Sequence, residues 1–136
     1  MILDLDKAID IYQAAKRDKN ITYVYDSELD KFILQKTKPI PNTIPFINSF
    51  DECRRIIDIY LEQDYISKYK EDCKNAIRED KYHNKIVSFL WFFEHIDGCF
   101  DFNNYECIKI CKVIKKWCKR NRIEFNPPSI NVPYKY

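Results

Sequence analysis

Cysteines and basic residues gather in residues 107–122, CIKICKVIKKWCKRNR, and both residue types could do chemistry. Thiolates together with a histidine can hold a zinc ion in a tetrahedral site. The chain offers two pairs whose members are four residues apart, His95 with Cys99 and Cys107 with Cys111. Structural zinc sites usually place their cysteines on short turns, whereas these pairs fall at a helix end and in a helix middle. A zinc-stabilised domain is therefore only a third hypothesis, and we expect no metal and no cofactor.

The same cysteines have a simpler interpretation as core residues. Cys107, Cys111 and Cys118 share one face of a predicted helix with Ile114, and free cysteine packs as a small apolar side chain. The sequence shows no signal peptide and no apolar run of membrane-spanning length, so we expect a cytoplasmic protein. In that reducing compartment all six cysteines are expected to be free thiols.

The basic residues of this stretch are predicted to lie on the opposite face of the helix. They are Lys109, Lys112, Lys115, Lys116, Lys119, Arg120 and Arg122. Residues 104–136 hold eight basic and two acidic side chains, a net charge of +6, whereas the whole chain carries +2. Basic residues near a helix C-terminus suit the helix dipole, so a solvated face is the first interpretation. The alternative is a site for an anionic partner, either the phosphates of a nucleic acid or an acidic protein.

The composition argues against an enzyme. The single glycine, Gly98, rules out a P-loop, a dinucleotide-binding fingerprint and the usual nucleophile elbow, because all three need glycine at a tight turn or close approach. The chain has no Cys-x-x-Cys redox pair, and the spacing of its acids points to no general acid–base catalysis. We therefore expect a protein that is not an enzyme and has no catalytic residues.

Three elements and a connector are predicted before residue 63. An apolar stripe at helical spacing predicts a helix over residues 3–17, and it consists of Leu5, Ala8, Ile9, Tyr12 and Ala15. The β-branched and aromatic runs ITYVYD and KFILQ on either side of SELD predict a hairpin. Three prolines then predict an extended connector, namely Pro39, Pro41 and Pro45. Ser49, three residues before Glu52, has the pattern of a helix N-cap, and an apolar stripe follows it at Cys53, Ile56, Ile57, Tyr60 and Leu61.

Further helices are predicted in the second half of the chain. Residues 66–80 should form a polar helix, and residues 82–96 a buried helix, because they are apolar nearly all round. Asn103 or Asn104 is expected to cap a last helix that runs to about Asn121.

The predicted fold class is α+β in a single domain. Its order is an N-terminal helix, a β-hairpin and then a bundle of about four helices. We expect this domain to span residues 1–125 and the proline-rich residues 126–136 to form an extended C-terminal tail.

Several short motifs resemble those of uncharacterised protein family 0158, a family of small bacterial proteins. The chain begins with the acidic segment LDLDKAI, continues with YVYDSELDKFIL and IPFINSFDECRRIIDIYL, and closes its last helix on KKWCKRNRIE. The resemblance covers residues 3–125. The hairpin turn lacks the Thr-Gly of the family, and the last helix is more basic than is usual there. The resemblance implies the fold and no activity, because none is established for the family.

Together these features favour a protein that works by binding another macromolecule. The leading hypothesis is a protein–protein interaction or regulatory module, such as an inhibitor that a phage or mobile element carries against host defence. Its basis is the small size, the lack of catalytic motifs and a composition typical of AT-rich coding sequences. The first alternative is a nucleic-acid-binding protein that uses the basic last helix. We expect no membrane partner, because the bulky apolar residues of that helix are needed for the core.

Overall fold

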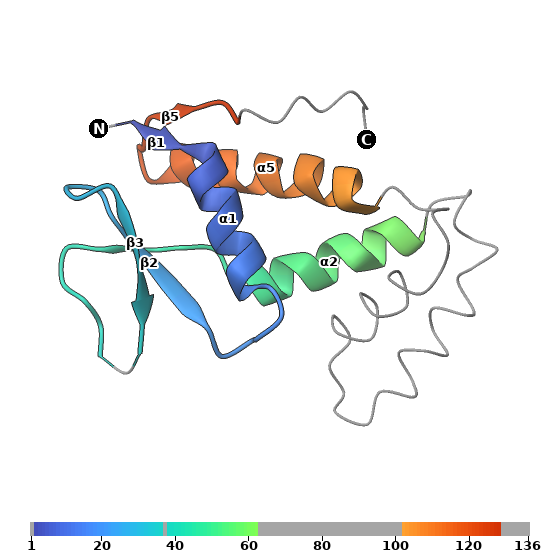
Figure 1. The fold of residues 1–136 in the computed structure, drawn as a ribbon, viewed down its shortest axis with the longest axis horizontal. Coiled ribbons are helices and arrows are strands. Elements are labelled where there is room, and N and C mark those ends of the chain that lie inside the picture. The colour runs from blue at the N-terminus through green and yellow to red at the C-terminus, as the bar shows by residue number, and fades with distance from the viewer. Residues whose placement is uncertain (1, 37, 63–101, 129–136) are drawn as a thin grey trace.

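The computed structural model describes residues 2–36, 38–62 and 102–128, in which three helices combine with two small sheets (Figure 1). The helices are α1 (Leu5–Ala15), α2 (Ser49–Leu61) and α5 (Phe102–Arg120). The strands are β1 (Leu3–Asp4), β2 (Thr22–Asp26), β3 (Lys31–Gln35), β4 (Ile44–Pro45) and β5 (Phe125–Asn126). The mixture of helices and sheets confirms the α+β class. The helices expected over residues 66–80 and 82–96 lie outside the described residues, so the described part holds three helices and no four-helix bundle.

The predicted hairpin is confirmed. β2 and β3 pair antiparallel from Thr22 opposite Gln35 to Asp26 opposite Lys31. The turn closes without Asn-Gly, because the Asp26 carboxylate accepts hydrogen bonds from the backbone N–H groups of Glu28 and Leu29. Asp30 ends the turn in a left-handed conformation (φ 48°), and its carboxylate accepts a 2.7 Å hydrogen bond from the Tyr25 hydroxyl.

The proline-rich connector is extended as expected, and it also adds a third strand to the hairpin. β4 pairs antiparallel with β2, so the sheet order is β3-β2-β4. The indole N–H of Trp117 donates a 2.8 Å hydrogen bond to the Pro45 carbonyl. The Trp117 ring also packs edge-on against Phe46 and Tyr25. This contact fixes the sheet on the C-terminal half of α5.

The first helix is shorter than predicted. Residues 3 and 4 form β1 instead, which pairs parallel with β5 through Leu3 opposite Phe125. Asp4 is the N-cap of α1, and its side chain accepts a 2.9 Å hydrogen bond from the backbone N–H of Asp6. All members of the predicted apolar stripe are buried. The pairing with residues 125–126 delays the start of the helix to Leu5, because it holds Leu3 in an extended conformation.

Two predicted helix caps are wrong. The N-cap of α2 is Asn48, whose side chain accepts a 3.0 Å hydrogen bond from the Asp51 N–H, and Ser49 is the first helical residue. Asn103 and Asn104 lie inside α5, which already includes Phe102. The C-terminus of α5 is closed by Arg122 at φ 55°, where the Ile123 N–H reaches the Cys118 carbonyl at 2.9 Å.

The three helices share one core. Tyr60 at the end of α2 packs on Phe102 and Tyr105 at the start of α5, whereas Phe46 just before α2 packs on Trp117 near the end of α5. The helices α2 and α5 therefore run in opposite directions, and α1 contacts both (Figure 1). Within the described part of the chain, none of the helices combines the length and the apolar character needed to cross a membrane.

Candidate binding surface

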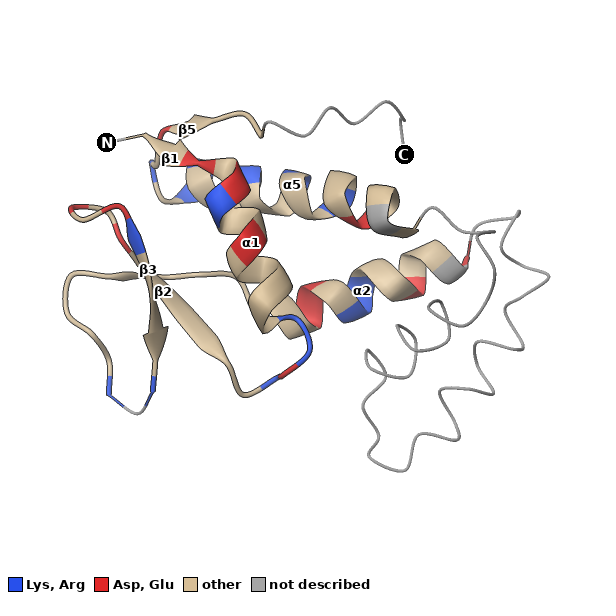
Figure 2. Cartoon of the chain, in the orientation of Figure 1, with Lys and Arg blue, Asp and Glu red and all other residues tan. Residues whose placement is uncertain are grey.

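The predicted basic face of α5 is present, although its members differ in exposure. Lys112, Lys116 and Lys119 are exposed, as are Arg120 and Arg122, whereas Lys109 and Lys115 are half-buried. Glu106 is the sole acidic residue of α5, so every charged side chain of the helix beyond it is basic. Figure 2 shows the contrast with α2, along which acidic and basic residues alternate.

A groove between α2 and α5 gathers part of this basic face. Its lining consists of Arg55, Ile56 and Ile59 of α2 with Lys109, Lys112, Val113 and Lys116 of α5. Ile56 is buried at the bottom, while Ile59 is 44% exposed, one of the large apolar side chains that remain open to solvent. The groove therefore combines an apolar strip with four basic side chains, three of them from the predicted set. Lys115, Lys119, Arg120 and Arg122 lie outside it.

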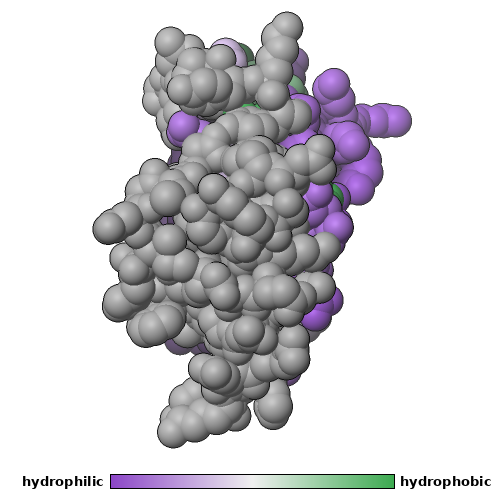
Figure 3. Space-filling model, turned by 90° about the vertical axis from the view of Figure 1, so that its right-hand side faces the viewer, coloured by the Kyte–Doolittle hydropathy of each residue, from purple (hydrophilic) through white to green (hydrophobic). Residues whose placement is uncertain are grey.

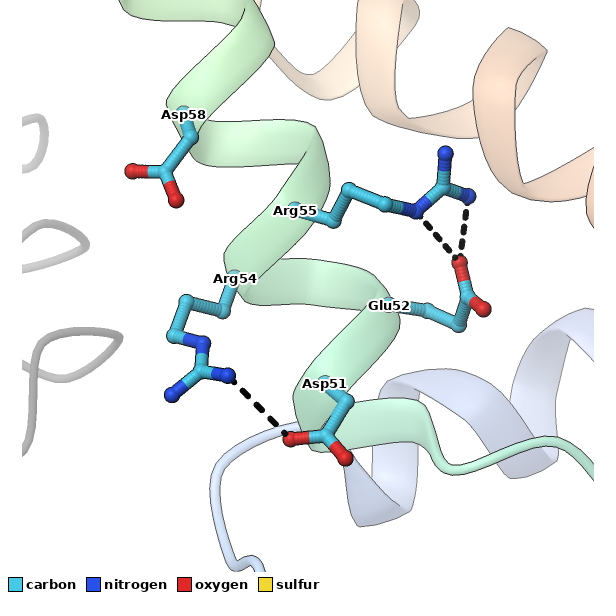
Figure 4. A pocket seen from close by; sticks show the side chains of 5 residues that line it. All are labelled: Asp51, Glu52, Arg54, Arg55 and Asp58. Carbon is cyan, nitrogen blue, oxygen red and sulfur yellow. Dashed lines mark hydrogen bonds and ion pairs between the residues drawn. The ribbon is translucent and has the colours of Figure 1, made fainter.

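The charge of α2 is divided between its two sides. Figure 4 shows Glu52 and Arg55 on the side toward α5, with Asp51, Arg54 and Asp58 on the other. The Arg55 Nε donates a 3.1 Å hydrogen bond to the Glu52 carboxylate, and Arg54 pairs with Asp51 at 3.8 Å. Arg55 is thus partly neutralised by Glu52. The α5 side supplies three of the four basic side chains that line the groove.

The groove is small. Its volume of about 180 Å³ lies below the range of roughly 300–1,000 Å³ that is usual for small-molecule pockets. Figure 3 shows that the described residues visible from one side of the molecule are mostly hydrophilic, with small apolar areas between them. A groove of this size suits a few side chains of a larger partner better than an enclosed small ligand.

The predicted cysteine face is confirmed for Cys118, and Cys111 also packs against the core, although less deeply than predicted. Cys118 is buried with Ile110, Ile114 and Trp117, but Cys107 and Cys111 are only half-buried. The helix is rotated relative to the prediction, so Glu106 occupies a core position beside Cys107. Desolvation raises the pKa of the Cys107 and Cys111 thiols, which keeps both protonated at neutral pH.

The described residues include only two of the four ligands predicted for zinc, so the zinc hypothesis stays a prediction. Across residues 2–36, 38–62 and 102–128, no three His, Cys, Asp or Glu side chains converge as metal ligands. Cys107 and Cys111 are free thiols, while the other two predicted ligands, His95 and Cys99, lie outside the described residues.

A buried polar cluster joins the three helices on the inner side of α5. The Glu106 carboxylate, 1% exposed, accepts hydrogen bonds from the Lys16 ammonium at 3.0 Å and from the Tyr12 hydroxyl at 2.9 Å. It also accepts from the Gln13 amide at 3.2 Å and from the Cys53 thiol at 3.6 Å. Lys16 is 4% exposed, so both charges are withdrawn from water and each depends on the other.

The geometry of this cluster is suited to stabilising the packing of the three helices and not to catalysis. Desolvation is the main cause that raises the pKa of Cys53, to about 12, so its thiol is not a nucleophile at neutral pH. Desolvation and then the negative charge of Glu106 place the Tyr12 pKa well above its usual range. Both groups therefore stay protonated and act as hydrogen-bond donors to Glu106.

The sequence does contain signals for two of these residues, Lys16 and Glu106. Lys16 continues the spacing of Leu5, Ile9 and Tyr12, which places it on the buried face of α1. Glu106 precedes Ile110 and Ile114 at the same four-residue interval, on the buried face of α5. Arg55 and Ile59 gave no such signal, because their role in the groove depends on which helix lies beside α2.

Comparison of the chain with protein-family models, with curated proteins and with solved structures found no match. The resemblance to uncharacterised protein family 0158 therefore stays a prediction.

Proposed function

We propose that this protein is a non-enzymatic module that binds another protein through the groove between α2 and α5. The observation that supports this proposal is the exposed Ile59 among Arg55, Lys109, Lys112 and Lys116. Protein interfaces combine an apolar centre with a polar rim, and charge complementarity steers the encounter. A small domain of this kind acts by occupying a surface of its partner, as a regulator or an inhibitor does.

Nucleic acid is the second candidate partner. The exposed Lys119, Arg120 and Arg122 continue the basic face beyond the groove, where they could contact phosphates. Phosphate contacts need no apolar strip, however, so Ile59 favours a protein. The two partners also differ in salt dependence, because neutralised phosphates release condensed counterions and make nucleic-acid affinity fall steeply with salt.

A capture experiment with paired variants tests the proposal. The intact chain is immobilised and exposed to nuclease-treated lysate of the cell type in which it acts. The test variant carries Lys112→Glu and Lys116→Glu in the groove. The matched control carries Lys119→Glu and Arg120→Glu, an equal change of charge on the same helix but outside the groove.

We expect the wild type and the control variant to retain the same lysate protein, at a constant ratio to the immobilised chain. The variant with Lys112→Glu and Lys116→Glu should lose that protein. Equal loss with both variants, or capture that occurs only when the nuclease is omitted, would replace the proposal by the nucleic-acid alternative. Retention of every captured protein by the groove variant would show that the groove is not the binding site.

A further inference from the structure

We infer that the partner segment is an amphipathic α-helix whose apolar stripe is bordered on one side by acidic residues. The inference rests on the proposed function and specifies the chemistry of the partner. It uses two properties of the groove, its length along α5 and the unequal charge of its two sides.

The length of the groove matches two turns of a helix. Lys109, Lys112, Val113 and Lys116 occupy positions i, i+3, i+4 and i+7 of α5, which span about 10 Å at 1.5 Å per residue. On the other side, Ile56 and Ile59 are separated by about one turn. A helix laid between α2 and α5 can place side chains from positions i, i+4 and i+7 on this apolar strip, as in other helix-in-groove complexes.

The charge of the groove is unequal. The α5 side has three lysines, whereas the α2 side has one basic residue, Arg55, with the Glu52 carboxylate beside it. A helix with acids on both sides of its stripe would meet Glu52 as well as Arg55. A helix with acids only on the side toward α5 would face Lys109, Lys112 and Lys116 at matching intervals of three and four residues. The geometry therefore favours a one-sided acidic pattern.

Lys109 is held in place on this side of the groove. Its ammonium lies 5.4 Å from the centre of the Tyr105 ring, whose side chain is buried. A cation held over an aromatic face loses less conformational freedom when it binds a carboxylate than a freely rotating lysine does. We therefore expect one acidic residue of the partner helix to pair with Lys109.

Synthetic helical peptides provide the test. The probe is a fluorescein-labelled 21-residue peptide with leucines in one stripe and glutamates along one side of it. The control peptide has the same composition in an order that breaks both stripes. Binding to the full chain is measured by fluorescence anisotropy at fixed salt, and the fold of each protein variant is checked by circular dichroism.

We expect the probe to bind at least about tenfold more tightly than the permuted peptide, because a few central contacts supply most of the affinity. Ile59→Asp, and separately Lys112→Glu with Lys116→Glu, should each weaken probe binding by about tenfold or more. Lys119→Glu with Arg120→Glu should change it by less than about threefold, the scale of exposed charge effects. A peptide with lysines in place of the glutamates should bind the groove variant better than the wild type.

Equal affinity for the probe and the permuted peptide would overturn the inference, because charge alone would then explain binding. Equal losses in the groove and control variants would overturn it for the same reason. If neither peptide binds while capture from lysate still depends on Lys112 and Lys116, the helix inference fails and the proposed function stands. If that capture is also absent, the proposed function fails with it.

Discussion

The contact between Glu106 and Lys16 should be among the most sensitive points of the fold. Glu106→Gln preserves the shape of the side chain and removes its charge. The Lys16 ammonium, with its side chain 5% exposed, would then remain inside the protein without a counterion. The amide that replaces the carboxylate also accepts fewer of the four donors supplied by Lys16, Tyr12, Gln13 and Cys53.

The expected cost follows from this loss of charge pairing. Removing one partner of a buried ion pair costs about 3–5 kcal/mol, which is a large part of the roughly 5–15 kcal/mol that stabilises a typical domain. Lys16→Met should cost less, since Glu106 keeps the Tyr12, Gln13 and Cys53 donors. The double variant, Glu106→Gln with Lys16→Met, should regain at least about 2 kcal/mol of unfolding free energy relative to Glu106→Gln alone, because it leaves no uncompensated charge.

Urea unfolding at pH 7, followed by far-UV circular dichroism, measures the free energy of unfolding for each variant. The exposed pair of Arg54 and Asp51, 3.8 Å apart with side chains 53% and 59% exposed, provides the matched control. In a double-mutant cycle of Arg54→Met and Asp51→Asn, the coupling energy of this pair should be below about 0.5 kcal/mol. Costs below about 1 kcal/mol for both single variants at Glu106 and Lys16, or costs that simply add, would refute burial of the pair.

Three further predictions concern helix ends and alkaline pH. Arg122→Gly should raise the free energy of unfolding by about 0.5–1 kcal/mol, because glycine tolerates φ 55°, whereas Arg120→Gly inside the helix should lower it; thermal melts compare the two. Asn48→Ala should cost about 1 kcal/mol in urea unfolding, and more than Ser49→Ala, if Asn48 is the cap of α2. The folded state raises the pKa of Cys53 from 9.0 to about 12, so it holds the thiol proton more tightly than the unfolded chain does. The contribution of Cys53 to stability should be complete below pH 9 and be lost at up to about 1.4 kcal/mol per pH unit between 9 and 12; an unchanged slope in Cys53→Ala would contradict this.

Local patterns in the sequence were sufficient for much of the fold. The apolar stripes of α1 and α2 depend only on spacing along one helix, and the structure buries the predicted members whose side chains it describes. The hairpin was also predictable, since its two strands are neighbours in the chain. The short strands were not, because β1 exists only through its pairing with β5, more than 120 residues away.

The basic surface was predictable as a helix face and not as a site. Spacing placed Lys112 and Lys116 on the outside of a helix, where the structure finds them. It could not show that Arg55 and Ile59 lie across a groove from them, because that arrangement depends on how α2 packs against α5. The rotation of α5 was missed for a related reason. Apolar spacing alone does not predict a buried glutamate, and the partner that allows Glu106 to be buried lies 90 residues away.

The buried cluster and the groove depend on the same helix packing. The Cys53 thiol reaches Glu106 from α2 at 3.6 Å, and each of these residues lies three positions before a residue that lines the groove, Ile56 and Lys109. Because the two helices run in opposite directions, Ile56 and Lys109 lie on either side of this contact along the helix axes, each about one turn from it. The ion pair of Lys16 and Glu106 adds α1 to this contact. The polar interior therefore sets the distance between the apolar strip of α2 and the lysines of α5, on which recognition of a partner would depend.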